Sequence, residues 1–325
     1  MSFRILLTGK NGQVGAELCR LLPSLGELIA LDHGDLDLAK PAEIRRVVRD
    51  LRPQLLVNAA AYTRVDDAEN NEPAAYAVNA EAPAFLAEEA KAVGAALIHY
   101  STDYVFDGRK NSPYLETDPT NPLSVYGKSK LAGEIAVQAS GVPHLILRSA
   151  WIYASRGHNF LLTILRLSTQ KDELRIVHDQ IGAPTWGREI AAGTIQILAQ
   201  LARRDFSAES LAEFGGIYHM TAGGETSWYK FAQAILEECA RSPRETPWIR
   251  AAMDGNPQIT RSITPITTQQ YPTPARRPAY SVLSNSRLFT AFGIRLPDWR
   301  SQLRALFQEA SQPPSSSDHP NTVLR

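Results

Sequence analysis

Short apolar runs alternate with helical patterns through the first 150 residues of this 325-residue chain. Alternation of this kind predicts βαβ units, and runs rich in Leu, Ile and Val predict parallel strands that are buried on both faces. We therefore expect an α/β fold with a Rossmann-type, doubly wound parallel sheet, which forms a dinucleotide-binding domain over residues 1–150. The expected strands are Arg4–Thr8, Leu28–Asp32, Leu55–Ala59, Ala95–Ser101 and His144–Ser149.

Helical patterns fill the gaps between these strands. Val14, Leu18, Leu21 and Leu22 share one helical face, and Pro23 is expected to end that helix. A second helix is expected at Pro41–Leu51, because proline is favoured in a first turn and apolar residues follow at helical spacing.

The pattern loosens after about Trp151. Residues 151–310 are expected to form mainly a smaller C-terminal α/β substrate-binding lobe, with parts of 173–220 returning to the first domain. The segment 311–325 contains Pro-Pro-Ser-Ser-Ser and predicts a disordered tail. We expect helices near Phe160–Leu167 and Glu189–Leu201 and strands near Leu174–Val177 and Ile217–Met220. Two more helices are expected, one capped by Thr226 that ends near Cys239 and one capped by Ser284 that ends near Gly293. Between them we expect a long surface loop at Arg244–Ala279.

Composition excludes several classes of protein. Thirty-four Lys and Arg balance thirty-four Asp and Glu, so no net charge attracts a nucleic-acid backbone. No stretch reaches the ~18 apolar residues of a membrane span, and the N-terminus predicts a strand rather than a signal peptide. The two cysteines, Cys19 and Cys239, suit a reducing compartment and are expected to be buried thiols. These features predict a cytoplasmic protein.

A glycine-rich turn follows the first expected strand. Gly9, Gly12 and Gly15 follow a GxxGxxG spacing, and Asp32 lies twenty positions after Gly12. Such glycines let the backbone approach a pyrophosphate at a helix N-terminus, and an acid at this place accepts hydrogen bonds from the adenosine ribose. A glycine turn without a ligand is the alternative, and the position of Asp32 disfavours it. By itself, Asp32 favours NADH over NADPH.

Tyr126 and Lys130 stand four residues apart at the start of a helical pattern, so they share one helical face. A nearby ammonium is expected to lower the pKa of the phenol and to make it a usable proton donor or acceptor. Thr102 follows the fourth expected strand, and Asn58 ends the third, at the sheet edge where ligands bind. A hydroxyl there can polarise a substrate carbonyl while Tyr126 protonates its oxygen. A solvated Tyr–Lys pair is the alternative reading.

These motifs resemble the extended short-chain dehydrogenase/reductases that modify sugar nucleotides, over most of residues 1–310. Within that group the chain is similar to the dTDP-4-dehydrorhamnose reductase family. The blocks that carry the likeness are Gly-Lys-Asn-Gly-Gln-Val-Gly (9–15), Val-Asn-Ala-Ala-Ala-Tyr-Thr (57–63), Ser-Thr-Asp-Tyr-Val-Phe-Asp-Gly (101–108), Asp-Gln-Ile-Gly-Ala-Pro-Thr (179–185) and Tyr-Pro-Thr-Pro-Ala-Arg-Arg-Pro (271–278).

The resemblance implies reduction of the C4 ketone of dTDP-4-dehydro-β-L-rhamnose to dTDP-L-rhamnose, the last step in making this activated sugar for glycoconjugates such as polysaccharides. It implies NADPH as cofactor, with NADH also accepted, and a homodimer. Thr102, Tyr126 and Lys130 would form the catalytic set. Cofactor contacts would come from Gly9, Gly12, Gln13, Val14, Gly15, Asp32, Asp37, Leu38, Ala61, Tyr62, Thr63, Tyr100, Tyr126 and Lys130, and substrate contacts from Thr102, Asp103, Trp151, Arg276 and Arg277.

Several alternatives stay open at this point. Trp151 could be a core tryptophan, and Arg276 and Arg277 could be solvated loop charges. Some family members are associated with Mg²⁺, for which Glu17 and Glu189 are the nearest candidates, but Arg188 lies beside Glu189 and we predict no metal site.

Two other functions compete with reduction. A sugar-nucleotide 4,6-dehydratase would need a Thr-Asp-Glu run, and Tyr104 stands here in place of the glutamate. A non-catalytic regulatory subunit, like that of methionine adenosyltransferase, shares the same blocks.

Overall fold

The computed structural model describes residues 3–203, 213–242 and 246–309. Its largest sheet has six parallel strands in the order β10-β5-β4-β3-β1-β2. This confirms the expected α/β class with a central parallel sheet. The strands are β1 (Arg4–Thr8), β2 (Glu27–Leu31), β3 (Leu55–Asn58), β4 (Ala96–Thr102), β5 (His144–Ser149) and β10 (Gly216–His219).

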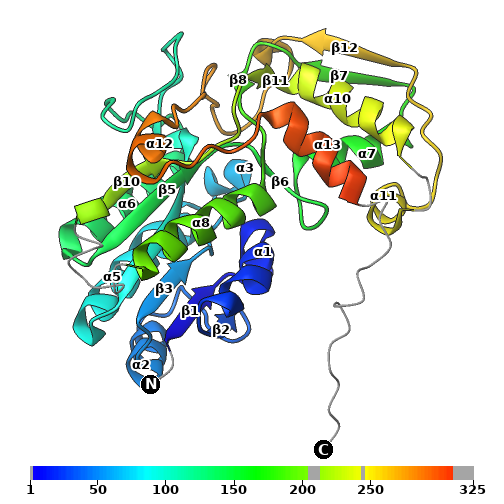
Figure 1. Cartoon of the computed structure of the whole chain (residues 1–325). Coiled ribbons are helices and arrows are strands. Elements are labelled where there is room, and N and C mark those ends of the chain that lie inside the picture. Colours follow the sequence, from blue (N-terminus) through cyan, green and yellow to red (C-terminus); the bar gives the residue numbers. More distant parts are fainter. Residues whose placement is uncertain (1–2, 204–212, 243–245, 310–325) are drawn as a thin grey trace, which may run out of the picture.

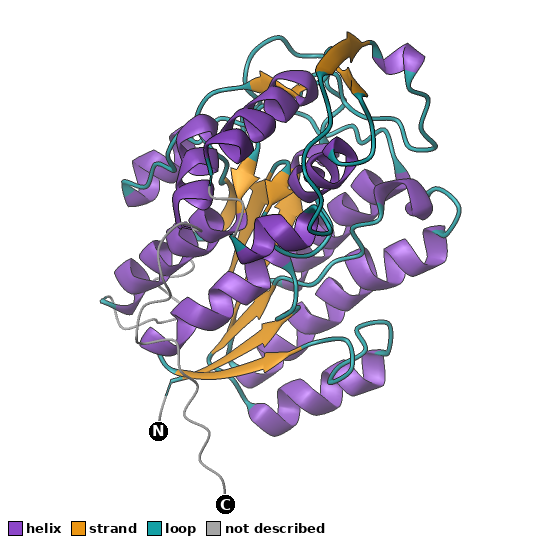
Figure 2. Ribbon diagram, turned by 90° about the vertical axis from the view of Figure 1, so that its right-hand side faces the viewer, coloured by secondary structure: helices purple, strands orange, loops and turns teal. Residues whose placement is uncertain are grey.

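Helices cover both faces of this sheet (Figures 1 and 2). Alternate residues of each strand enter opposite cores: Ile5 and Leu7 pack with α1, α8 and α12, whereas Leu6 packs with α2, α5 and α6. Strands buried on both faces explain the continuous apolar runs in the sequence. The helices on the first face are α1 (Gln13–Leu21), α8 (Gly187–Ala202) and α12 (Ser286–Phe292), and those on the second are α2 (Pro41–Leu51), α5 (Ala82–Val93) and α6 (Val125–Ser140).

Short helices follow β3 and lead into α5. They are α3 (Val65–Ala68), α4 (Glu72–Tyr76) and a π-helical turn at Ala77–Glu81. Gly133 of α6 lies against this turn, where an added Cβ would come within 2.1 Å of the Asn79 carbonyl oxygen. Close packing therefore fixes α6 against the π-helical turn.

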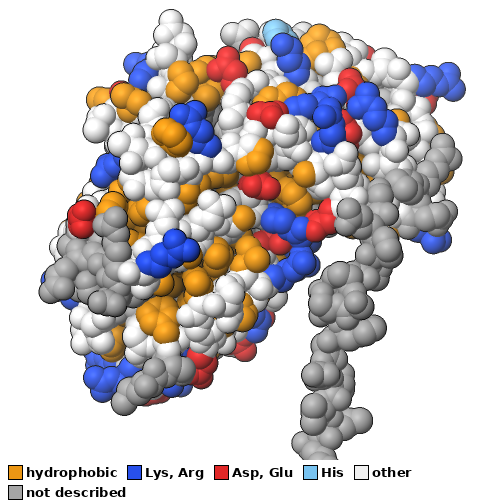
Figure 3. All heavy atoms as spheres, viewed as in Figure 1, with side chains coloured by type: hydrophobic (Ala, Val, Ile, Leu, Met, Phe, Trp, Pro, Cys, Tyr) orange, Lys and Arg blue, Asp and Glu red, His pale blue; other side chains and the backbone are white. Residues whose placement is uncertain are grey.

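A second, smaller part of the molecule has its own apolar core (Figure 1). Phe231 and Leu303 are fully buried in it. Figure 3 shows Lys and Arg side chains interspersed with Asp and Glu on one face of this part. One pair of opposite charges joins α13 to α10, with Arg304 3.9 Å from Glu238. Its elements are α7 (Phe160–Ser168), α10 (Trp228–Arg241), α11 (Pro247–Ala252), α13 (Trp299–Glu309), β7 (Glu173–Val177) and β12 (Ser262–Ile266), and the short strand pairs beside it are β6 (Ile152–Tyr153) with β9 (Thr185–Trp186) and β8 (Ile181–Gly182) with β11 (Thr226–Ser227).

The prediction of a long surface loop at 244–279 is wrong, because this segment contains α11, β12 and a 3-10 turn at Thr268–Gln270. β12 pairs in parallel with β7, which lies about ninety residues earlier in the chain. A two-stranded sheet leaves one edge of each strand unpaired, so β12 tolerates Pro265. The pairing partner is distant in sequence, and local composition therefore could not show this strand.

Some local expectations are off by one residue. Ser227, not Thr226, caps α10 by accepting a hydrogen bond from the Lys230 amide at 3.2 Å. Asn285, not Ser284, stands at the start of α12. The first helix ends just before Pro23, as expected: α1 stops at Leu21, and a 3-10 turn at Leu22–Ser24 follows it.

Cys19 and Cys239 are half-buried rather than fully buried thiols. The expected tail at 311–325 lies outside the described residues. The domain boundary at residue 150 stays a prediction, although α8 and β10 from the second half of the chain pack on the large sheet.

Candidate active site

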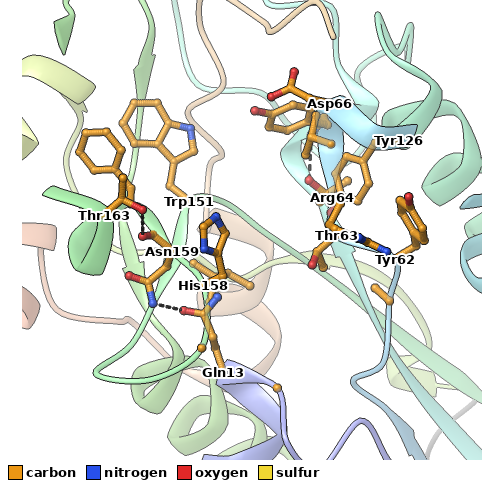
Figure 4. Close-up of a pocket in the computed structure, with 18 of the residues that line it drawn as sticks. Gln13, Tyr62, Thr63, Arg64, Asp66, Tyr126, Trp151, His158, Asn159 and Thr163 are labelled. Atoms are coloured by element: carbon orange, nitrogen blue, oxygen red, sulfur yellow. Dashed lines mark hydrogen bonds between the residues drawn. The ribbon is translucent and has the colours of Figure 1, made fainter. Parts of the chain in front are cut away.

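A cavity of about 1910 Å³ opens at the carboxyl ends of the large sheet, between it and the second part of the molecule. Figure 4 shows Tyr62 and Tyr126 on one side of it, Trp151 and His158 on the other, and Gln13 at its base. Among the residues expected to bind ligands, Gly15 and Arg276 do not line the cavity. Those that do are Gly9, Gly12, Gln13, Val14, Asp32, Asp37, Leu38, Ala61, Tyr62, Thr63, Tyr100, Thr102, Asp103, Tyr126, Lys130, Trp151 and Arg277.

The glycine turn lies between β1 and α1 and has little room for side chains. Gly9 has a left-handed φ of +79°, and a Cβ there would come within 2.7 Å of the Ala60 amide nitrogen. A Cβ on Gly15 would lie 2.0 Å from the Gly9 carbonyl oxygen, so Gly15 acts by letting helix and turn approach each other. No side chain caps α1 at Gly12. The N-terminus of α1 can therefore receive a diphosphate.

Asp32 follows β2 and is fixed by its neighbours. Its carboxylate accepts hydrogen bonds from Asn11 Nδ2 at 2.8 Å and from the Gly34 amide at 2.9 Å. Lys10 Nζ lies 3.4 Å from Asp32 and 2.5 Å from Asp35. Burial alone would raise the pKa of Asp32, but the backbone hydrogen bonds and Lys10 together lower it below the usual value. The carboxylate is therefore charged and held in place.

Two side chains that sequence reasoning missed hold the walls of this half of the cavity. Asn79 accepts from the Tyr62 amide at 2.8 Å and donates to the Tyr62 carbonyl at 3.0 Å. Asn159 Nδ2 donates to Gln13 Oε1 at 2.9 Å, which joins the glycine turn to the second half of the chain (Figure 4). Neither asparagine lies in a recognisable motif, and the Asn159–Gln13 pairing spans 146 residues.

Tyr126 and Lys130 occupy the first turns of α6. Ser124 caps this helix by accepting from the Gly127 amide at 3.1 Å. Lys130 Nζ donates to the Tyr100 carbonyl at 2.6 Å and lies 3.5 Å from His99 Nε2. Burial lowers the pKa of Lys130 to about 8, although the charge of Glu134 opposes this shift.

The expectation that Lys130 lowers the pKa of Tyr126 is not met in this structure. Burial raises the pKa of the phenol to about 12, with a partial offset from the Thr102 hydroxyl. Helical spacing shows which residues share a face but not how deeply they are buried, and here desolvation is the larger effect. The phenol is consequently protonated at neutral pH, which is the form a proton donor needs.

Thr102 ends β4, and Asp103 follows it at the floor of the cavity. The Thr102 hydroxyl donates to Asp103 Oδ1 and accepts from the Tyr104 amide, both at 3.1 Å. Only 1% of Asp103 is exposed. Burial raises the pKa of its carboxyl to about 6, although hydrogen bonds from Ser281 and Thr102 partly offset the rise.

Asp103→Asn is expected to increase stability at neutral pH. The folded-state pKa of this acid lies above its usual 3.8, so wild-type stability falls as pH rises through about 6. Unfolding free energies of the variant and the wild type should agree below about pH 4, and the variant should be higher by up to roughly 3 kcal/mol at pH 7. Denaturant melts across this range measure the difference. Asp107→Asn is the control with the opposite sign, because hydrogen bonds lower the pKa of Asp107. An Asp103→Asn difference that does not change with pH would refute this account.

Trp151 lies across the cavity from Tyr126 (Figure 4). Its backbone is left-handed, with φ 47°, and its indole stacks on that of Trp228 with ring centroids 3.4 Å apart. Gly182 leaves room for this stack, because a Cβ there would lie 2.4 Å from the Trp151 ring. Trp228 begins α10 and also lines the cavity, so the two indoles form one aromatic wall. Trp228 lies outside every sequence motif and was missed.

The two neighbouring arginines at 276 and 277 separate. Arg276 is exposed and lies outside the cavity. Arg277 lines the cavity, and its Nη2 and Nη1 bind the two oxygens of Asp66 at 2.7 and 3.1 Å. Adjacent side chains in an extended segment point in different directions, so sequence could name the pair but not the member that faces the cavity.

Of the two acidic residues considered for Mg²⁺, Glu17 has other partners. Glu17 binds Arg188 Nε at 3.0 Å and lies 3.6 Å from Arg20. Within residues 3–203, 213–242 and 246–309, no cluster of three His, Cys, Asp or Glu side chains could hold a metal ion. In the same part of the chain, every helix is too short or too polar to cross a membrane.

Comparisons with known proteins agree with this fold. The family model described as RmlD substrate binding domain matches residues 3–312. A dTDP-4-dehydrorhamnose reductase of Burkholderia thailandensis is 51% identical over 297 residues, which are 91% of this chain and 95% of that protein. An Escherichia coli K12 protein of the same name is 41% identical over 94% of this chain and 97% of its own length.

A solved structure is similar as well. The dTDP-4-dehydrorhamnose reductase of Bacillus anthracis, in complex with NADP, is 30% identical and superposes with a TM-score of 0.81, covering 95% of this chain and 100% of that one. These likenesses confirm the resemblance seen in the sequence. The chain belongs to the RmlD family, together with these dTDP-4-dehydrorhamnose reductases.

Proposed function

We propose that this protein reduces the C4 ketone of dTDP-4-dehydro-β-L-rhamnose to dTDP-L-rhamnose with a nicotinamide dinucleotide. The observation that carries the proposal is that Tyr126, Lys130 and Thr102 line the same cavity as the glycine turn and Asp32. The proposed proton donor and the proposed dinucleotide site thus lie in the same cavity. Relatives at 51% and 41% identity bear the name of this activity.

The residues at the base of the cavity fit a dinucleotide. Gly9 and Gly12 leave the backbone bare at the uncapped start of α1, which suits the diphosphate, and the charged Asp32 suits ribose hydroxyls. When bound, the dinucleotide supplies the hydride that the ketone carbon accepts. Gln13, Val14, Asp37, Leu38, Ala61, Tyr62, Thr63 and Tyr100 line the rest of this site.

The chain itself contributes a proton donor, the Tyr126 hydroxyl, held beside the ketone. Tyr126 holds its proton because burial raises the pKa of the phenol, and it gives that proton to the oxygen of the ketone as negative charge develops there. The Thr102 hydroxyl, whose single proton is donated to Asp103 Oδ1 in the structure, turns that proton to the same oxygen when the ketone is bound. The Lys130 ammonium, one helical turn from Tyr126, stabilises the phenolate left behind.

The opposite wall suits the sugar nucleotide. The Trp151–Trp228 stack offers a flat apolar face to a deoxysugar ring. Arg277 can bind a diphosphate in two-pronged fashion, and Asp66 orients its guanidinium before substrate arrives. Arg276, which is exposed outside the cavity, is not assigned to the substrate site.

Two further properties stay proposals. We infer NADPH as the preferred dinucleotide, with NADH also accepted, because Lys10 brings positive charge next to Asp32 and the Bacillus anthracis relative was solved with NADP. The homodimer and the cytoplasmic location remain predictions from the sequence.

Asp32→Asn is expected to shift dinucleotide preference toward NADPH. The carboxylate accepts hydrogen bonds from ribose hydroxyls but repels a 2′-phosphate, so the variant should raise the KM for NADH and lower that for NADPH, each by about five- to tenfold. Asp50→Asn, an exposed acid on α2, is the control and should change neither value. Equal changes in both KM values would show that Asp32 does not discriminate between the dinucleotides.

The competing functions are less well supported. A 4,6-dehydratase would need a carboxylate at the position of Tyr104, whose half-buried ring instead packs edge-on against Tyr126 with ring centroids 5.5 Å apart. A regulatory subunit with the same blocks can keep Tyr126 and Lys130, so these residues do not separate it from an enzyme. The names of the relatives at 51% and 41% identity favour the reductase.

The experiment that tests the proposal is oxidation of NADPH and NADH by the purified full-length chain. The substrate is dTDP-4-dehydrorhamnose made in situ by the preceding epimerase. We expect rapid oxidation that depends on this substrate and yields dTDP-L-rhamnose. Dinucleotide binding without oxidation would reject the proposal and favour the regulatory reading, and release of water from dTDP-glucose would favour the dehydratase.

A further inference from the structure

A buried ion pair lies beneath the helix that carries the proton donor. Glu134 of α6 binds Arg148 of β5 through two hydrogen bonds, Nε to Oε1 at 2.9 Å and Nη2 to Oε2 at 2.6 Å. Glu134 is fully buried and Arg148 is 2% exposed. The Ser101 hydroxyl of β4 also donates to Glu134 Oε1, at 2.5 Å. Burying two charges costs desolvation free energy, so a buried ion pair often adds little to the stability of the fold. The presence of this pair therefore calls for a reason other than stability.

The pair joins the elements that carry the reacting groups. Glu134 lies one helical turn after Lys130 and two turns after Tyr126, on the same face of α6. Ser101 immediately precedes Thr102 and pairs with Arg148 in the register of β4 and β5. The carboxylate of Glu134 is thus bonded to both strands beneath the catalytic helix, and it fixes the height and rotation of that helix on the sheet.

Glu134 also acts on the charge of Lys130. The groups that face Lys130 are the Tyr100 carbonyl and His99 on β4, and Glu134 and Tyr126 on its own helix. Burial lowers the pKa of His99 well below its usual value, so His99 is neutral and adds no charge. The groups that face Glu134 itself are Arg148, Ser101 and Lys130. Glu134 is the anion among these groups, and its field raises the pKa of Lys130 against the effect of burial.

We propose that Glu134 is a positioning residue for the reduction, which anchors α6 to β4 and β5 and keeps Lys130 charged at neutral pH. This inference rests on the proposed function, in which the ammonium supports Tyr126. It assigns a second task to a carboxylate that touches neither ligand nor reacting atom.

The chain offers a matched control. Glu89 of α5 is also buried and bound by an arginine through two hydrogen bonds, from Arg49 Nε at 2.6 Å and Nη2 at 2.8 Å. Its helix carries no residue of the cavity. Glu89→Gln therefore removes a carboxylate held by arginine in the same two-bond geometry on another helix, although Arg49 is 62% exposed.

The direct test measures the pKa of Lys130 by NMR titration of protein labelled with ¹³C at lysine Cε. The Lys130 signal is assigned by its loss in Lys130→Met. Glu134→Gln is expected to lower this pKa by about one unit, because the opposing charge is removed. Glu134→Asp, which keeps the charge, should stay near the wild type. Glu89→Gln should leave the Lys130 pKa unchanged. An unchanged Lys130 pKa in Glu134→Gln overturns the proposal.

Turnover gives a second, independent readout. In Glu134→Gln the alkaline limb of kcat should move to lower pH by the same amount as the NMR pKa, whereas a merely structural defect would lower kcat equally at every pH. If Glu134→Gln does not fold, the Glu134→Leu/Arg148→Met pair removes both charges at similar volume. The pKa of Lys130 should then still fall, but by less than in Glu134→Gln, because the positive charge of Arg148 is lost as well. A wild-type chain without turnover would reject the proposed function, and the NMR titration would still decide the role of Glu134.

Discussion

Tyr126→Phe is expected to lower kcat by about two to four orders of magnitude while leaving the dissociation constant of the dinucleotide within about twofold. The substitution removes only the hydroxyl that carries the transferable proton. The ring keeps its packing, including the edge-on contact with Tyr104. Thr102 alone cannot replace the donor, because its hydroxyl proton is far less acidic. Steady-state rates and fluorescence titration of bound NADPH measure the two quantities.

Tyr153→Phe is the matched control for this result. Tyr153 is a buried tyrosine, 1% exposed, that does not line the cavity. Deleting its hydroxyl should leave kcat near the wild-type value. If Tyr126→Phe keeps more than about a tenth of wild-type kcat, a different group donates the proton and the assignment of Tyr126 is wrong.

Lys130→Met should show opposite effects on activity and stability. We expect kcat to fall by about two to three orders of magnitude, because the positive charge that supports the phenolate is gone. Stability at pH 7 should instead rise, by up to roughly 3 kcal/mol, because burial lowers the lysine pKa from 10.5 to about 8 and the folded chain carries that penalty. Thermal melts and initial rates test both parts on the same samples.

The pH dependence has a defined sign. For a lysine whose folded-state pKa is lowered, the destabilisation is fully present below about pH 8 and disappears as pH rises toward 10.5, so the stability gain of Lys130→Met should vanish over this range. Wild-type kcat should decline as pH rises through about 8, where Lys130 loses its proton. A variant that is both inactive and less stable at pH 7 would mean that Lys130 supports the fold rather than the reaction.

Much of the sheet unit could be predicted from the sequence. β1, β5 and α2 begin and end at the expected residues, because buried parallel strands are continuous apolar runs and Pro41 marks a helix start. The glycine spacing predicted the turn before α1, since Gly9 needs a left-handed backbone and Gly15 a close approach. These features are local, and local patterns determine them.

Other features depend on contacts that a single segment does not show. β12 is a strand because β7 pairs with it, and Trp228 joins the cavity wall through its stack on Trp151. The pKa of Tyr126 depends on burial depth, which spacing does not reveal. Arg277 rather than Arg276 faces the cavity because Asp66, on α3, holds it there. In each case the determining neighbour is far away in the sequence.

The measurement that tests the central claim most directly is transfer of deuterium from the nicotinamide C4 position of labelled NADPH to dTDP-4-dehydrorhamnose, with wild-type protein and Tyr126→Phe side by side. The product is analysed by mass spectrometry and NMR. We predict one deuterium per sugar, at C4 of dTDP-L-rhamnose, and almost none with the variant. Deuterium at another carbon, or equal transfer by the variant, would contradict the proposed reduction or its proton donor.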